Sequence, residues 1–86
     1  MKYRLEYHKD FIKFLAKHSD IKDKALSAFE QLAQNPYENS LDIAKLKGEI
    51  NKYRLRLGKY RFLYEIFETQ ILIYAYKADS RGDVYK

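Results

Sequence analysis

The spacing of apolar residues changes along the chain, and these changes predict the order of its structural elements. Residues 3–7 alternate apolar and polar side chains, a pattern typical of a short strand with one buried face. Apolar residues recur at helical spacing in residues 9–18 and again in residues 21–32, which indicates two amphipathic helices. Pro36 ends the second helix, because the residue before a proline disfavours the helical conformation. The break between the helices is short, so we expect an antiparallel helical hairpin.

The second half of the chain predicts three strands in close succession. Residues 37–52 have weak periodicity and are interpreted as a loop. Residues 53–57 alternate, residues 60–67 are rich in aromatic and branched side chains, and residues 71–77 are again typical of a strand. The predicted fold class is therefore α+β: a four-stranded antiparallel sheet, in the order β-α-α-β-β-β, packed on one face by the N-terminal αα-hairpin. Its other face is left open to solvent, and the first strand lies beside one of the later three.

Length and composition narrow the classes of function. The 86 residues predict a single domain, residues 1–86. The absence of cysteine excludes disulfides and thiolate metal sites. No apolar run suits a signal peptide or a membrane span, so we expect a cytoplasmic protein without membrane contacts. The histidines are ten residues apart, the glycines are isolated and no nucleophilic triad can be argued, so neither a metal nor a cofactor is predicted.

Charge is concentrated in one short stretch of the chain. The formal net charge is +5, yet residues 1–44 balance seven basic against seven acidic residues, and residues 62–86 carry three against four. Residues 45–61 hold seven basic residues against a single glutamate. The basic residues are Lys45, Lys47, Lys52, Arg54, Arg56, Lys59 and Arg61. Such a block suggests a polyanionic partner, although it is equally compatible with a solubilising face.

Strand alternation predicts where the arginines of this stretch lie. If the apolar residues of the two strands face the helices, then Arg54, Arg56 and Arg61 meet on the open face of the sheet. Clustered guanidinium groups repel one another unless an anion lies among them, and their geometry suits phosphate oxygens. The alternative is cross-strand pairing with Glu65 and Glu68, which would neutralise part of the cluster.

The end of the chain permits two interpretations. Arg81 and Tyr85 could fold over the basic face, where the tyrosine would stack on a base. Alternatively, the polar end is a frayed terminus. If the protein is an enzyme, these residue types suit RNA cleavage by its own 2′-hydroxyl, which requires positioning, charge stabilisation and proton transfer but no metal.

Three blocks of the sequence resemble the RelE/ParE superfamily, the toxins of type II toxin–antitoxin systems. The blocks are residues 45–48 (KLKG), 53–65 (YRLRLGKYRFLYE) and 81–85 (RGDVY). With the N-terminal strand, the helical hairpin and the proline stop, the resemblance covers essentially the whole chain. It implies a small sheet packed on an αα-hairpin, in agreement with the predicted fold.

The resemblance favours the RelE-like branch, whose members are metal-independent, ribosome-dependent mRNA endoribonucleases that inhibit translation. It implies that Arg54 and Arg56 grip phosphates and help proton transfer, and that Arg61 stabilises transition-state charge. It also implies that Arg81 assists the leaving group or holds phosphate, and that Tyr85 stacks on or orients the base. It implies that Lys45 and Lys47 contact ribosomal RNA or the message backbone. Lys52 and Lys59, from the same basic stretch, are also predicted to bind RNA.

The resemblance also implies partners and leaves alternatives open. The implied partners are mRNA in the ribosomal A site, ribosomal RNA, and a cognate acidic antitoxin that forms a hetero-oligomer with the toxin and covers its arginines. Asp79 and Ser80 replace the basic or histidine residues of many relatives, which leaves open a catalytically weak protein that binds RNA and antitoxin. A further alternative is a ParE-like inhibitor of DNA gyrase.

Overall fold

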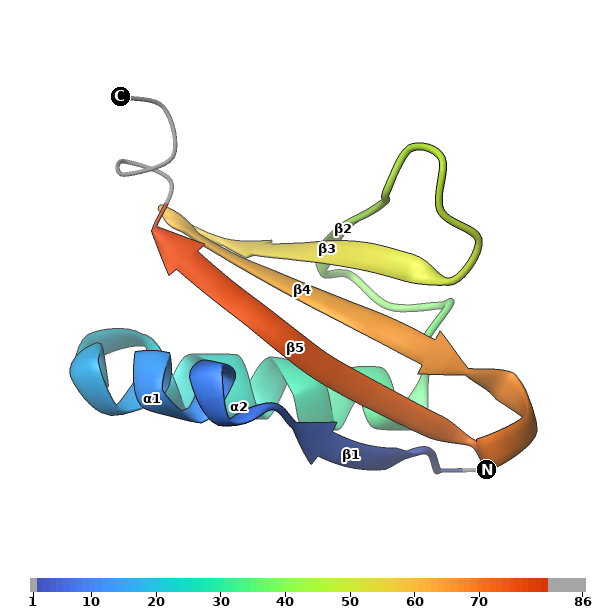
Figure 1. Ribbon diagram of the computed structural model, residues 1–86, viewed down its shortest axis with the longest axis horizontal. Helices are drawn as coiled ribbons and strands as arrows, with labels where there is room; N and C mark the ends of the chain where they lie inside the picture. Colours follow the sequence, from blue (N-terminus) through green and yellow to red (C-terminus); the bar gives the residue numbers. More distant parts are fainter. Residues whose placement is uncertain (1, 81–86) are drawn as a thin grey trace.

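A computed structural model describes residues 2–80, and the predicted site residues Arg81 and Tyr85 lie outside the described residues. These described residues form two helices, five strands and one 3-10 turn, arranged as Figure 1 shows. In order they are β1 (Arg4–Tyr7), α1 (Lys9–Lys17), α2 (Ser19–Gln34), β2 (Asp42–Lys45), β3 (Lys52–Leu57), β4 (Tyr60–Phe67), η1 (Glu68–Gln70) and β5 (Leu72–Ser80). No helix within residues 2–80 has the length and apolar character needed to cross a lipid bilayer.

The strands form one sheet in the order β1-β5-β4-β3-β2, with the helical hairpin on one side (Figure 1). The predicted α+β class, the helical hairpin and the β3-β4-β5 meander are confirmed. β1 lies beside the last strand of the meander, so its predicted pairing with a later strand is also confirmed.

Two details of the predicted sheet are wrong. The sheet has five strands, because β2 forms within the predicted loop and pairs with β3. This edge strand places the neighbouring apolar residues Ile43 and Ala44 between two charged residues, so it does not show the alternation of apolar and polar residues that is typical of a strand. In addition, β1 runs parallel to β5, so the sheet is not wholly antiparallel. Hydrophobic periodicity identifies the buried face of a strand, but it does not determine the direction of a strand paired across a long connection.

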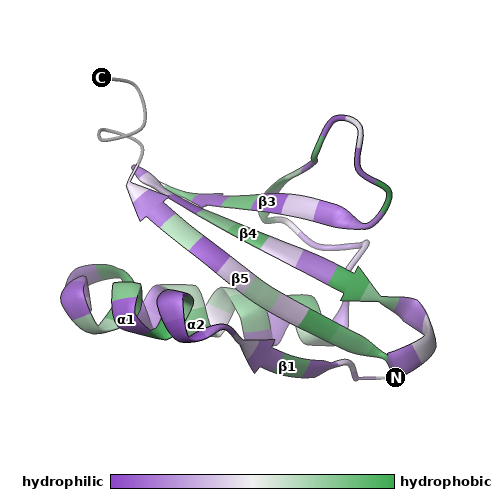
Figure 2. Ribbon diagram, in the orientation of Figure 1, coloured by the Kyte–Doolittle hydropathy of each residue, from purple (hydrophilic) through white to green (hydrophobic). Residues whose placement is uncertain are grey.

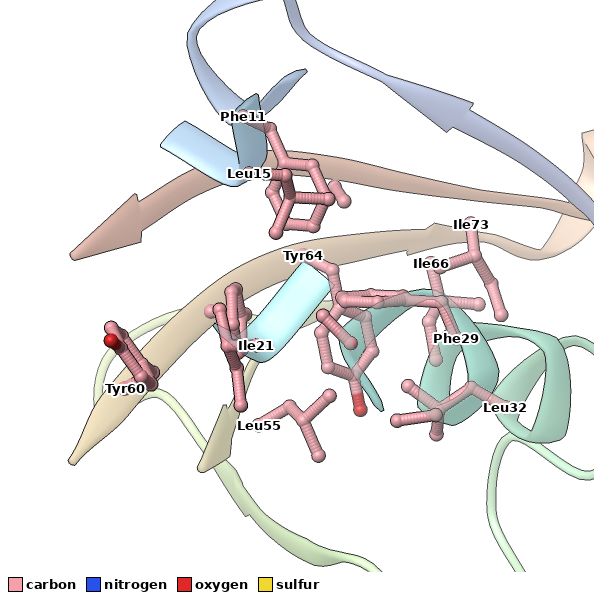
Figure 3. Packing of buried hydrophobic residues seen from close by; sticks show 14 residues of the cluster. Phe11, Leu15, Ile21, Phe29, Leu32, Leu55, Tyr60, Tyr64, Ile66 and Ile73 are labelled. Carbon is pink, nitrogen blue, oxygen red and sulfur yellow. The ribbon is translucent and has the colours of Figure 1, made fainter. Parts of the chain in front are cut away.

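The core lies between the hairpin and the inner face of the sheet. β4 alternates buried and partly exposed residues, and Figure 2 shows hydrophobic and hydrophilic positions interleaved along the central strands. Phe11 of α1 and Phe29 of α2 meet edge to face with ring centroids 5.4 Å apart, and both rings contact Phe62 of β4. These rings belong to a larger hydrophobic core, to which both helices and the strands β3, β4 and β5 contribute residues (Figure 3). Neither helix of the described residues covers the outer face of the sheet.

Tyr64 places a hydroxyl inside this core. Its side chain is fully buried, its oxygen finds no hydrogen-bond partner among residues 2–80, and burial raises the pKa of the hydroxyl (Figure 3). We expect Tyr64→Phe to stabilise the fold by about 1 kcal/mol, because a buried, unpaired hydroxyl has lost its bonds to water without replacement. Urea unfolding, with Tyr76→Phe as a partly exposed control, measures the difference. Destabilisation by Tyr64→Phe would show that the hydroxyl has a bonding partner.

Candidate nucleic-acid interface

The register of β3 and β4 brings three arginines onto one face of the sheet. Arg56 lies directly opposite Arg61, and Arg54 lies opposite Leu63 in the next outward-facing pair. The residues that alternate with them, such as Leu55 and Phe62, are fully buried against the helices. Because directly opposed residues of a sheet share a face, all three guanidinium groups lie on the open side. We call Arg54, Arg56 and Arg61 the arginine cluster.

Two aspartates frame the arginine cluster. Asp42 of β2 lies opposite Arg56, and Asp79 of β5 lies opposite Arg61, so an acid–arginine–arginine–acid row crosses four strands. Arg56 Nε donates to Asp42 Oδ2 at 3.1 Å, and Arg54 Nη2 lies 3.9 Å from Asp42 Oδ1. Arg61 Nε donates to Asp79 Oδ1 at 3.4 Å. Within residues 2–80, the carboxylates of Asp42 and Asp79 therefore offset part of the charge of the three guanidinium groups.

The alternative in which Glu65 and Glu68 neutralise the cluster is wrong. Glu65 lies opposite Lys52, one outward-facing pair beyond Arg54. Glu68 lies in the turn before β5, where Tyr3 donates to its Oε1 at 2.5 Å and Tyr37 donates to its Oε2. These two hydrogen bonds lower the pKa of the Glu68 carboxyl group. The acids that meet the arginines come instead from β2 and from the end of β5, which the hydrophobic pattern does not assign to strands.

The arginines are held in place but remain accessible. The side-chain exposed fraction is 19% for Arg54, 36% for Arg56 and 25% for Arg61. Ion pairs at a protein surface contribute only about 0–1 kcal/mol, because water screens them. A phosphate accepting charge-assisted hydrogen bonds from two guanidinium groups can therefore compete with the aspartates. Among residues 2–80, Asp42 and Asp79 contact these guanidinium groups through partly exposed ion pairs.

The four predicted RNA-binding lysines do not lie together. Lys52 begins β3 and shares the open face with the arginine cluster. Lys45 lies opposite Tyr53 on the other side of the sheet, where both line a shallow hollow with Tyr37. Lys47 precedes β3 in the β2–β3 connection, and Lys59 lies in the turn after β3, so they occupy opposite ends of that strand.

A β-bulge in β5 adds residues to the open face that the sequence pattern misses. Tyr64 pairs with Ala75 and Leu63 pairs with Lys77, so Tyr76 is an extra residue in the strand. Beyond this bulge the alternation is reversed, which places Lys77 and Asp79 on the open face together with Tyr74. Regular alternation from the buried Ala75 would have turned Lys77 and Asp79 inward.

Metal ligands are not clustered in this part of the molecule. Among residues 2–80, no group of three or more histidine, cysteine, aspartate or glutamate side chains could hold a metal ion. The chemistry available on the described face is therefore that of guanidinium, ammonium, carboxylate and phenol groups.

Comparisons with known proteins agree with the fold and identify the family. No family model matches the chain. A curated protein of Methanocaldococcus jannaschii, described as "Putative toxin RelE1", is 33% identical over 91 aligned positions, covering 100% of this chain and 98% of that protein.

Solved structures give the same picture. The structure of the archaeal RelE-RelB complex from Pyrococcus horikoshii OT3 includes a chain with a TM-score of 0.81 and 30% identity, covering 95% of this chain and 98% of that chain. The RelB-RelE antitoxin-toxin complex from Methanococcus jannaschii gives a TM-score of 0.75 at 29% identity, with 94% and 95% coverage. The isolated Escherichia coli RelE toxin, at 19% identity, has the same fold with a TM-score of 0.76, covering 96% of this chain and 90% of that chain. The 33% sequence identity to a curated RelE toxin, over the full length of this chain, and the shared sheet and hairpin show that the chain belongs to the RelE family of toxins.

Proposed function

We propose that this protein is the toxin of a RelBE-type toxin–antitoxin pair and cleaves mRNA on the ribosome without a metal ion, thereby inhibiting translation. The arginine cluster on the open sheet face is the observation that carries this proposal. The solved relatives from Pyrococcus horikoshii and Methanococcus jannaschii are described as complexes with RelB, which supports an antitoxin partner for this chain.

In the proposed reaction, the RNA supplies its own nucleophile. The 2′-hydroxyl loses its proton, with help from Arg54 and Arg56, and attacks the adjacent phosphorus. The bond to the 5′-oxygen of the next nucleotide breaks, that oxygen takes up a proton, and a 2′,3′-cyclic phosphate remains. Arg54 and Arg56 hold the phosphate, while Arg61 offsets the negative charge that develops in the transition state. Arg81 and Tyr85, beyond the described residues, would assist the leaving oxygen and orient the base.

The lysines divide between two roles in this proposal. Lys52 lies beside the arginine cluster and would contact the message. Lys45 faces the other side of the sheet, and Lys47 and Lys59 lie in the connections at either end of β3. These three positions suit contacts with ribosomal RNA around the message. An acidic antitoxin would inhibit the protein by covering the open face, where its carboxylates would replace the RNA phosphates.

The ends of the cleaved message test the reaction. The toxin is dialysed against EDTA, freed of chelator, and added to translating ribosomes in ordinary magnesium buffer. We expect cleaved mRNA with 2′,3′-cyclic phosphate or 3′-phosphate ends. Products with 3′-hydroxyl ends, or activity that returns only with an added transition metal, would contradict the mechanism. Inhibition of DNA supercoiling with intact mRNA would instead identify a gyrase inhibitor.

The aspartates that frame the cluster give the proposal a second candidate. Asp79 contacts Arg61, to which we assign transition-state stabilisation. This contact favours the alternative in which the protein binds RNA and antitoxin but does not cleave RNA. Salt-sensitive RNA binding with no cleaved ends in the same ribosome experiment would identify that protein.

Removing the charge of Asp79 is expected to tighten RNA binding. Asp79→Asn removes one negative charge beside Arg61, and with it the repulsion between that carboxylate and a bound phosphate. Affinity for single-stranded RNA should therefore rise roughly two- to fivefold, as expected for a partly exposed charge pair of up to about 1 kcal/mol. Fluorescence anisotropy at fixed salt measures the change. Asp23→Asn, an exposed position on α2 away from the open face, controls for net charge. Equal gains in both variants would show that the position of the aspartate is irrelevant.

A further inference from the structure

Two tyrosines of β5 lie side by side on the open face. The Tyr74 and Tyr76 rings have centroids 6.4 Å apart and planes only 29° apart, and both side chains are partly exposed. Tyr74 pairs with Glu65, an outward-facing residue of β4, and Tyr76 is the extra residue of the bulge. The bulge therefore allows both rings and the following Lys77 and Asp79 to lie on the same face. We call Tyr74 and Tyr76 the tyrosine pair.

The tyrosine pair is continuous with the arginine cluster. Lys52 Nζ lies 5.8 Å from the centroid of the Tyr76 ring, within the range of a cation–π contact. Lys52 and Arg54 are alternate residues of β3, so their side chains leave the same face about 7 Å apart. An RNA strand with a phosphate bound to the arginine cluster can therefore extend along the same face of the sheet toward the two tyrosine rings.

Packing inside the protein does not account for the position of these rings. The core lies on the opposite side of the sheet, where α1 and α2 cover it (Figure 1). Of the other aromatic groups, His8 approaches Tyr74 edge-on, with ring centroids 6.4 Å apart. In the part of the chain that the structure describes, no helix covers the tyrosine pair, as expected of an aromatic surface that receives a flat ligand.

Charge distinguishes between the ligands that could lie there. Tyr74 is flanked in register by Glu6 of β1 and Glu65 of β4. Two carboxylates disfavour a phosphate, or an acidic peptide, directly over this ring. They tolerate an uncharged nucleobase, whose amino groups they can accept hydrogen bonds from.

We propose that Tyr74 and Tyr76 form a stacking platform for the bases of single-stranded RNA whose phosphates bind the arginine cluster. The proposal rests on the proposed function, because it assigns the bases of the same RNA. Base stacking on aromatic side chains contributes about 1–3 kcal/mol per base and tolerates any sequence. The platform lies on described residues and is separate from the interaction assigned to Tyr85.

Binding of a short fluorescein-labelled oligoadenylate to the full chain tests the platform. Tyr74→Ala and Tyr76→Ala should each weaken binding roughly 5- to 150-fold, the range that the stacking free energy gives. Tyr74→Phe and Tyr76→Phe should bind as wild type, because the ring is retained. The dependence of affinity on salt should be unchanged in all four, because no phosphate contact is lost. An abasic strand of the same length should bind equally to these four tyrosine variants.

Parallel variants separate failure of the platform from failure of the proposed function. Arg54→Ala should weaken binding of both strands and flatten the salt dependence. If Arg54→Ala has no effect, the RNA-binding function itself is wrong. If Arg54→Ala weakens binding while both tyrosine-to-alanine variants bind normally, the platform is wrong. Tyr74→Leu and Tyr76→Leu, which keep apolar bulk without an aromatic face, replace the alanine variants if thermal melting shows that those unfold. If the tyrosine variants lose affinity only for an acidic peptide, the surface belongs to a protein partner and the proposal is overturned.

Discussion

Replacing Arg61 with alanine is expected to slow mRNA cleavage by about 100- to 1000-fold, the loss typical when one group that stabilises transition-state charge is removed. Arg61 lies directly opposite Arg56, and its guanidinium group is oriented by Asp79. The loss should therefore fall mainly on the rate at saturating ribosome concentration. Arg61→Lys should recover only part of it, because an ammonium group keeps the charge but not the bidentate geometry.

Arg4→Ala is the matched control for this experiment. Arg4 is also an exposed arginine with an acidic neighbour, because its Nη1 lies 3.8 Å from Glu6 Oε2. It belongs to β1, at the edge of the sheet and away from the arginine cluster. Its cleavage rate should remain close to that of wild type. Wild-type cleavage by Arg61→Ala, or equal damage in Arg4→Ala, would remove the basis for assigning transition-state stabilisation to Arg61.

The second large effect concerns stability. Phe62→Ala is expected to lower the free energy of unfolding by about 3–5 kcal/mol, because it removes a large apolar side chain and leaves a cavity. Phe62 is fully buried in β4 and contacts Phe11, Phe14 and Phe29. Small domains are stable by only about 5–15 kcal/mol, so much of the variant should be unfolded at moderate temperature.

Urea unfolding followed by circular dichroism measures this loss. Ile12→Ala is the control, because Ile12 is 55% exposed on α1 and its truncation should change stability by less than about 0.5 kcal/mol. A small loss in Phe62→Ala, similar to that of Ile12→Ala, would contradict the packing of the hairpin on β4.

The position of the arginine cluster follows from sequence because β3 and β4 are regular. Their alternation is uninterrupted, and the turn at Gly58, which takes the left-handed conformation that glycine favours, fixes the register. Arg54, Arg56 and Arg61 therefore share a face without any tertiary information. Their site roles remain predictions.

The surroundings of the cluster could not be obtained in this way. Asp42 belongs to an edge strand of four residues, which forms because it pairs with β3. Lys77 and Asp79 depend on the bulge at Tyr76, which shifts the alternation by one residue and leaves no periodic trace in the sequence. Both features arise from pairing between strands, so local propensity does not encode them.

The parallel pairing of β1 with β5 has a consequence for the order in which the molecule is completed during synthesis. β1 is made first, yet its partner residues 72–75 are among the last to be made of the described chain. Loop closure over nearly the whole sequence must precede this contact, which favours slow, late docking. Until then the hairpin lacks part of the surface that buries its apolar side, and β4 lacks a neighbour. We therefore expect a growing polypeptide to complete the sheet face that carries Arg61 and Asp79 only after β5 has been synthesised.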